Sequence, residues 1–234
     1  MEMEVVDFGI KDYEEILKLQ LSLFERLLEE KKDGKEEREV MLIGEHTPVI
    51  TLGRRGRDSN VLISEEGLKN LGIKIYHIGR GGDVTYHCQG QLIVYPILDL
   101  EKHHLGVKDY VNLLEESVIR LLQKYGISGE RIDGATGVWL GKGTMQERKI
   151  CAIGIKCSHF CTMHGIGLNV NSDLSGFSFI NPCGFQDKGV TSMEKEICYK
   201  SSLKGGIIPE GYRLNMNEVK KDFLDIFLSL IFPL

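Results

Sequence analysis

A cysteine and a lysine provide the two side chains best suited to covalent chemistry in this sequence. Cys183 lies between Pro182 and Gly184, which predicts a turn where its thiol can face a cleft, and Lys149 precedes an apolar run. A thiol reacts as its thiolate, and a nearby ammonium group lowers the thiol pKa because it favours the charged form. If the two side chains meet in space, they predict acyl transfer through a thioester on Cys183. Taken alone, a Pro-Cys-Gly run is more often a structural turn.

A second candidate is the glycine-rich segment that begins at Arg80 and ends at His87. Paired glycines let the backbone pass close to a ligand, and Arg80 and His87 could donate hydrogen bonds nearby. The segment fits neither of the common phosphate-binding spacings. A plain hairpin connection is the alternative.

Cys157 and Cys161, with His159 between them and His164 after them, have the side-chain types that bind zinc. They lack a second well-spaced pair of ligands, so we predict no metal site here. His87 and His164 are also candidate general bases, and each could equally be a structural histidine.

The composition is typical of one globular enzyme domain that spans residues 1–234, with 42% hydrophobic residues, 27 glycines and 5 prolines. The first residues lack a signal-peptide pattern, and no apolar run approaches the length needed to cross a bilayer. We therefore expect a cytoplasmic protein with reduced cysteines and no membrane partner.

A net charge of -5 argues against nucleic-acid binding. Two basic groups could dock an acidic partner or could be solvated surface: Arg54, Arg55 and Arg57, and Lys142, Arg148, Lys149 and Lys156.

Apolar periodicity predicts helices over 12–31, 107–125 and 218–232, and Ser64 is a suitable N-cap for a short helix that ends before Gly72. Strands are predicted at 40–43, 49–52, 74–78, 92–98, 137–140, 149–156 and 162–170. The first two strands are close enough to form a pair. Because strands occur in adjacent groups, the pattern favours an α+β fold with a mixed or antiparallel sheet and flanking helices.

Five segments together resemble the lipoyl(octanoyl) transferases in order and spacing, from about residue 40 to Met193. They are residues 44–49, 80–87, 149–156, 163–170 and 180–184. The resemblance implies a fold like that of the lipoate and biotin protein ligases. It also implies transfer of an octanoyl group from acyl carrier protein to a lysine of lipoyl domains or of the glycine cleavage H protein, with no cofactor.

The same resemblance implies roles for individual residues. Cys183 would carry the acyl thioester, and Lys149 would lower its pKa. The acyl pocket would be lined by Arg80, Gly81, Gly82, Asp83, Val84, Thr85, Tyr86 and His87, by Ala152, Ile153 and Gly154, and by His164, Gly165, Ile166 and Gly167.

The sequence departs from the family pattern at Cys88 and Gln89, where a glycine and a proline are usual. This change could alter the fit of the acyl chain or place Cys88 near the pocket as an oxidisable thiol. Two alternative functions remain open. One is an ATP-dependent lipoate or octanoate ligase on the same fold, and the other is an inactive protein that binds lipoyl domains.

Overall fold

A mixed sheet forms the centre of the computed structural model, which describes residues 3–36, 38–181, 189–203, 205, 209 and 211–233. Its strand order is β1 (Glu4–Lys11), β2 (Val40–His46), β6 (Gln91–Ile97), β10 (Cys161–Asn169), β9 (Arg148–Ser158), β8 (Ala135–Leu140) and β7 (Glu130–Ile132). The pair β1–β2 is parallel, and β11 (Gly189–Val190) also adds to β9 in parallel. The other pairs are antiparallel. The predicted α+β class with a mixed sheet is confirmed.

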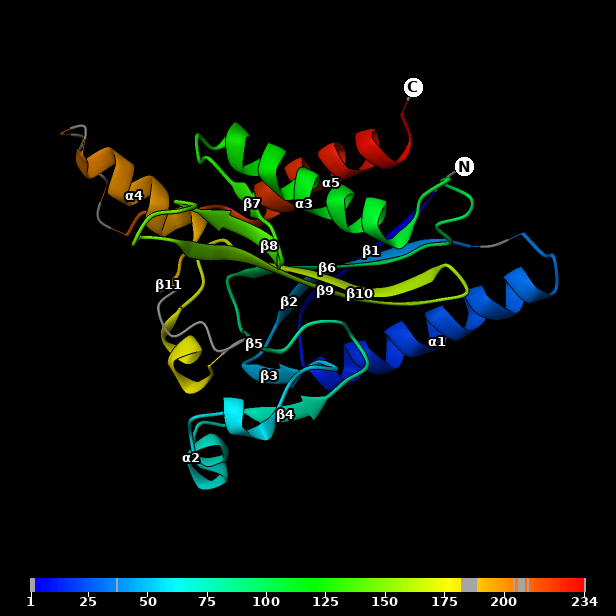
Figure 1. Cartoon of the computed structure of the whole chain (residues 1–234), viewed down its shortest axis with the longest axis horizontal. Coiled ribbons are helices and arrows are strands. Elements are labelled where there is room, and N and C mark those ends of the chain that lie inside the picture. Colours follow the sequence, from blue (N-terminus) through cyan, green and yellow to red (C-terminus); the bar gives the residue numbers. More distant parts are fainter. Residues whose placement is uncertain are drawn as a thin grey trace.

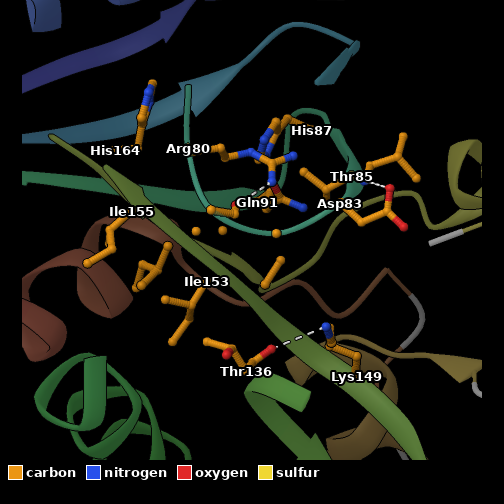
Figure 2. Close-up of a pocket in the computed structure, with 18 of the residues that line it drawn as sticks. Arg80, Asp83, Thr85, His87, Gln91, Thr136, Lys149, Ile153, Ile155 and His164 are labelled. Atoms are coloured by element: carbon orange, nitrogen blue, oxygen red, sulfur yellow. Dashed lines mark hydrogen bonds between the residues drawn. The ribbon is translucent and has the colours of Figure 1, made fainter. Parts of the chain in front are cut away.

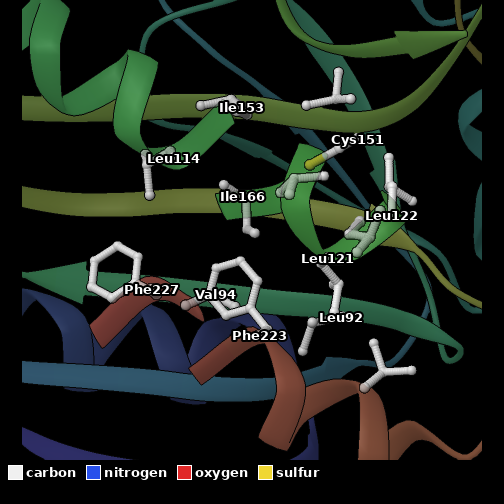
Figure 3. Close-up of a cluster of buried hydrophobic side chains, with 14 of the residues drawn as sticks. Leu92, Val94, Leu114, Leu121, Leu122, Cys151, Ile153, Ile166, Phe223 and Phe227 are labelled. Atoms are coloured by element: carbon white, nitrogen blue, oxygen red, sulfur yellow. The ribbon is translucent and has the colours of Figure 1, made fainter. Parts of the chain in front are cut away.

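Helices cover both faces of this sheet (Figure 1). The helix α1 (Tyr13–Lys32) packs on one face against β6 and β10. The helices α3 (Val107–Lys124) and α5 (Met216–Ile231) pack on the other face and against each other. Figure 3 shows how Phe223 and Phe227 of α5 lie over the sheet near Leu92 and Val94. Every residue of β6 and β10 is buried because both faces of the sheet are covered, and the sequence of β6 is accordingly apolar at nearly every position.

A smaller sheet contains the strands β4 (Lys74–His77), β3 (Val49–Leu52) and β5 (Val84–His87), in that order. The prediction that residues 40–43 and 49–52 pair with each other is therefore wrong. The strand β2 continues beside β1 as far as His46, and the Thr47 amide donates to the Lys11 carbonyl at 3.2 Å. The chain then turns at Pro48, which has no N–H to extend the ladder, and enters the other sheet.

The predicted helices are confirmed within a few residues at each end. Asp12 caps α1 by accepting a hydrogen bond from the Glu14 amide, and Ser64 caps α2 (Glu65–Asn70) through the Gly67 amide. The strands β1, β5, β7 and β11 and the helix α4 (Met193–Leu203) were not predicted. The strand β1 is mostly exposed at the edge of the sheet, so its sequence lacks the alternation that marks a half-buried strand. The described residues also include two short 3-10 helices, Asp58–Asn60 and Ser175–Phe179.

Of the helices formed by the described residues, none has the length and apolar character required to cross a membrane.

Candidate active site

A cavity of about 450 Å³ lies where the small sheet and the glycine-rich segment meet β9 and β10 of the large sheet. Figure 2 shows side chains of Arg80, His87 and Gln91 on one side of this cavity and Ile153, Thr136 and Lys149 on the other. Residues from segments far apart in the sequence therefore face a common space. The size suits a small, mostly apolar group with a few polar contacts.

The cavity collects nearly all the pocket residues predicted from the sequence. Those that line it are Arg80, Gly81, Gly82, Asp83, Val84, Thr85, His87, Ala152, Ile153, Gly154, His164, Gly165, Ile166 and Gly167. Tyr86 is not among the described lining residues. Its ring packs edge-on against Phe177, with ring centroids 5.6 Å apart, inside the apolar cluster of the small sheet. On β5 the side chains of Thr85 and His87 alternate with that of Tyr86, so Tyr86 points to the other face.

The side chain of Arg80 holds the glycine-rich segment in place. Its Nη2 donates to the Thr51 carbonyl at 2.8 Å and to the Thr51 Oγ1 at 2.9 Å, and the residue is buried. The Gly81 amide donates to the Ile155 carbonyl at 2.7 Å, which ties the segment to β9. A Cβ on Gly154 would lie 2.7 Å from the Gly81 carbonyl oxygen, so this close approach requires glycine. Arg80 therefore donates to protein groups and also lines the cavity, and its expected role as a donor to a ligand stays a prediction.

His87 belongs to a buried chain of hydrogen bonds. Its Nδ1 lies 2.6 Å from the Gln91 Oε1, so this nitrogen carries the proton and donates. Gln91 in turn donates to the Asn169 Oδ1 at 2.8 Å, and Asn169 donates to the Thr191 carbonyl at 3.0 Å. Burial lowers the pKa of His87 to about 3. A base this weak is poorly matched to proton transfer near neutral pH, so His87 fits a structural role better than a catalytic one.

His164 lies in the middle of β10 with a backbone φ of 61°, a left-handed conformation that is uncommon for residues other than glycine. Its amide donates to the Oε1 of Gln20 from α1 at 3.1 Å. Burial lowers the pKa of the His164 ring to about 3, which makes a neutral imidazole facing the cavity. The argument against His87 as a general base therefore applies to His164 as well.

Lys149 lies near the start of β9, and its ammonium group is at the cavity. The Nζ donates to the Thr136 carbonyl at 3.3 Å and lies 4.5 Å from the centroid of the Trp139 ring (Figure 2 draws the Thr136 contact). Backbone pairing places Val190 of β11 directly beside Lys149, and the Thr191 amide donates to the Lys149 carbonyl at 3.0 Å. Cys183, the predicted nucleophile, lies outside the described residues.

The other cysteines are poor candidates for the nucleophile. None of the five in the described part of the chain, Cys88, Cys151, Cys157, Cys161 and Cys198, lines the cavity. Burial raises the pKa of the Cys88 thiol to about 12 and raises that of the Cys151 thiol further. The suggestion that Cys88 is a second thiol of the pocket is therefore wrong, since its sulfur is buried and contacts the Asp173 carbonyl at 3.5 Å.

The turn between β9 and β10 contains the cysteines and histidine of the weak zinc pattern. Cys161 pairs with Ser158, and Cys157 pairs with Thr162, so the two cysteines occupy opposite faces of the hairpin. Within the ranges that the structure describes, no three His, Cys, Asp or Glu side chains gather as metal ligands.

The two basic groups predicted from the sequence differ in how far acidic side chains of the protein compensate their charges. Arg54, Arg55 and Arg57 are exposed, and Arg55 lines the cavity. Arg148 instead forms a bidentate pair with Glu196, with contacts of 2.7 and 2.5 Å, so its charge is compensated inside the protein. The first group is therefore the better candidate for an acidic partner.

Sequence periodicity did not reveal several lining residues: Tyr13, Ile78, Tyr95, Val111, Thr136, Trp139, Asn169, Phe177 and Val190. Tyr13 and Val111 lie within the helices predicted over 12–31 and 107–125, and apolar periodicity gave no sign that they face a cavity. Trp139 carried a signal in the sequence, because it is the single tryptophan of the chain and an indole ring is the aromatic face that attracts cations best.

Comparisons with known proteins agree with this geometry. Residues 12–227 match the family model of the lipoyl protein ligase A/B catalytic domain. An octanoyltransferase from Parabacteroides distasonis is 48% identical over 222 residues, which cover 94% of this chain and 96% of that protein. An octanoyltransferase from Bacteroides fragilis is 47% identical over 221 residues, 94% of each chain.

Two solved structures share the fold. The bi-partite lipoate protein ligase from Thermoplasma acidophilum superposes with a TM-score of 0.63 at 15% identity, covering 99% of this chain and 84% of that one. Lipoate-protein ligase A bound with ATP superposes with a TM-score of 0.65 at 13% identity, covering 99% and 86%. At these identities the likeness concerns the fold alone.

Proposed function

This chain belongs to the lipoyl protein ligase A/B catalytic domain family and is an octanoyltransferase, and we propose that it works through an octanoyl thioester on Cys183 that Lys149 assists. The donor in this proposal is octanoyl-acyl carrier protein. The acceptor is a lysine of the lipoyl domains of 2-oxoacid dehydrogenases or of the glycine cleavage H protein. Residues 1–234 act as a single catalytic domain, which fits the presence of apolar clusters on both faces of one sheet.

One observation carries the assignment of the catalytic pair. Lys149 lines the cavity together with Ile180 and Gly189, the described lining residues that lie closest in sequence to Cys183 on either side. The absence of every described cysteine from that lining adds support, because a thioester mechanism needs a thiol at the cavity.

In the first step the Cys183 thiolate attacks the carbonyl carbon of the carrier thioester. The new C–S bond forms as the bond to the carrier sulfur breaks, and the leaving carrier thiolate takes a proton from the Lys149 ammonium. Backbone N–H groups stabilise the oxyanion that develops in between.

In the second step the amine of the acceptor lysine attacks the Cys183 thioester. Lys149, now neutral, removes the proton that this nitrogen loses as the amide bond forms. The Cys183 thiolate leaves and is again paired with a Lys149 ammonium, so both groups return to their starting charge states.

The exposed arginines beside the cavity suit an acidic carrier or acceptor. In the portion of the chain that the structure describes, no ion pair involves Arg54, Arg55 or Arg57. Uncompensated charges at an entrance raise association rates, and salt screens them. An association rate with the carrier that does not change with salt would argue against this docking role.

The thioester is tested by intact-mass analysis after incubation with octanoyl-loaded carrier protein. We expect one added octanoyl group that hydroxylamine removes, and no such adduct on Cys183→Ala. Cys198→Ala is the matched control, because this cysteine lies outside the described cavity lining, and it should form the adduct normally. An acylated Cys183→Ala enzyme would exclude the proposed nucleophile.

The role of Lys149 is tested by the pH dependence of Cys183 alkylation. Lys149→Ala should move the alkylation profile to higher pH, because the thiolate loses its neighbouring cation, whereas the exposed Lys69→Ala should not. An identical profile in Lys149→Ala would remove this lysine from the mechanism. Free octanoate with MgATP should give no adenylate, which separates the transferase from a ligase.

A further inference from the structure

The far end of the cavity is polar, although its middle is apolar. Tyr13, Tyr95 and His164 all line the cavity, and each is at most 4% exposed. Their rings contact one another directly or through His46: Tyr95 lies 6.3 Å from His164, and Tyr13 lies 5.2 Å from His46, measured between ring centroids. We define Tyr13, Tyr95 and His164 as the polar wall.

The hydroxyl groups of the two tyrosines in the polar wall differ in their hydrogen bonding. The Tyr13 hydroxyl is buried and has no hydrogen-bond partner among the described residues. The Tyr95 hydroxyl, in contrast, lies 3.0 Å from the His46 Nε2. A buried hydroxyl without a partner costs free energy unless water or a ligand satisfies it, and Tyr13 is at a cavity that can hold water.

His164 is held in the polar wall at a conformational cost. Its left-handed backbone is sparsely populated for a residue with a side chain, and such residues persist where the surrounding structure fixes them. Here the Oε1 of the buried Gln20 accepts a hydrogen bond from the His164 amide and fixes this conformation from α1. The rings remain uncharged near neutral pH, because burial lowers the pKa of His46 to about 4 and that of His164 to about 3, and it raises the pKa of Tyr13.

The polar wall lies at the opposite end of β9 from Lys149. His164 pairs with Ile155, and Lys149 and Ile155 are roughly 20 Å apart along the strand, since a strand advances about 3.3 Å per residue. Figure 2 likewise shows Lys149 and His164 on opposite sides, with Ile153 between them. An extended octanoyl chain is roughly 9 Å long, since each of its seven C–C bonds, about 1.5 Å long, advances about 1.3 Å along the axis of the zigzag. Lys149 and the polar wall both line the cavity, so their side chains make the free length shorter than this backbone separation.

We propose that Tyr13, Tyr95 and His164 set the upper limit on acyl-chain length, so that octanoyl groups fit and longer chains are rejected. An eight-carbon chain lies over the apolar middle of the cavity and leaves the polar wall hydrated. Each further methylene displaces that water and strips hydrogen bonds from the Tyr13 hydroxyl and the His164 ring. This inference rests on the proposed use of the cavity as the acyl site.

The test compares acylation rates for carrier proteins loaded with octanoyl, decanoyl and dodecanoyl chains. Tyr13→Phe removes the buried hydroxyl and should raise the decanoyl-to-octanoyl rate ratio about tenfold. His164→Gly removes the ring, suits the left-handed backbone, and should also raise the dodecanoyl rate.

Each variant has a matched control elsewhere in the fold. Tyr110→Phe removes another buried tyrosine hydroxyl, on the buried face of α3, and His159→Gly replaces another histidine with positive φ, in the exposed turn after β9. Neither control residue lines the cavity, and both should keep the wild-type rate ratio.

An unchanged rate ratio in both Tyr13→Phe and His164→Gly would overturn the proposal, as would an equal change in the controls. If Tyr13→Phe fails to fold, Tyr95→Phe tests the same wall. Failure of the thioester mechanism itself is distinguishable, because wild-type enzyme would then form no octanoyl adduct, whereas failure of the polar wall leaves that adduct intact.

Discussion

The ammonium group of Lys149 lies over the indole ring of Trp139, with the Nζ 4.5 Å from the ring centroid. The indole Nε1 donates to the Ala135 carbonyl at 2.8 Å, which fixes the ring within β8. A cation held over a fixed aromatic face has a defined position while its charge is maintained. Trp139 is thus a positioning residue for the proposed catalytic lysine.

Replacement of Trp139 with Leu should slow octanoyl transfer about fivefold to tenfold, because a cation–π contact of this kind is worth about 1 kcal/mol. The rate of acyl-enzyme formation measures this effect. Trp139→Phe keeps an aromatic face and should restore most of the rate, which a purely structural role would not predict. A full rate in Trp139→Leu would show that the ring does not position Lys149.

The ion pair between Arg148 and Glu196 should stabilise the region next to Lys149. Burial raises the pKa of Glu196, but its hydrogen bonds with Arg148 and Thr191 outweigh that effect and lower it overall. Glu196→Gln should reduce the free energy of unfolding by about 2 kcal/mol, since it leaves Arg148 partly buried and unpaired. Urea denaturation measures this loss. Glu194→Gln, which weakens a more exposed pair with Arg213, should cost less than about 1 kcal/mol.

Acid should destabilise the protein through its buried histidines. Burial lowers the pKa of His46 to about 4 and those of His87 and His164 to about 3, whereas an unfolded histidine titrates near 6.5. The unfolded chain therefore binds more protons below pH 6.5. The contribution of the neutral histidines to stability is complete above that pH and is lost as the pH falls toward their pKa values in the folded state.

For each of these histidines, the free energy of unfolding should fall by about 1.4 kcal/mol for every pH unit of acidification between pH 6.5 and the pKa of that histidine in the folded state. Urea denaturation at several pH values between 7.5 and 4.5 measures the slope. His46→Gln should give a shallower slope than the wild type. Identical slopes in the two proteins would indicate that His46 is not buried and neutral.

Restoring the usual family residues at Cys88 and Gln89 should leave acyl transfer within about twofold of wild type. The Cys88 thiol is buried away from the cavity, so the double variant Cys88→Gly and Gln89→Pro does not change the lining. Octanoyl transfer assays check this expectation. A large change in chain-length preference would instead mean that this turn shapes the cavity from outside.

Much of the architecture follows from local pattern. The helices α1, α3 and α5 were predicted because their apolar residues repeat at the helical period, and this repeat encodes one buried face. The strands β6, β9 and β10 were predicted from their apolar or β-rich runs. The paired glycines marked the segment from Arg80 to His87 as a candidate ligand-binding segment, and the resemblance to a family assigned this segment and residues 164–167 to the acyl pocket.

The sequence by itself determined which segments are helical or extended, and which residue types could carry acyl transfer. Only the tertiary structure decided that β2 and β3 belong to different sheets, that Arg80 is used to hold a loop, and that Tyr13 faces the cavity. The repeat of apolar residues shows which face of a helix or strand is buried, but it does not show which other elements pack against that face. Partners such as Gln20 and His164 are far apart in the chain, and their contact depends on how the layers pack.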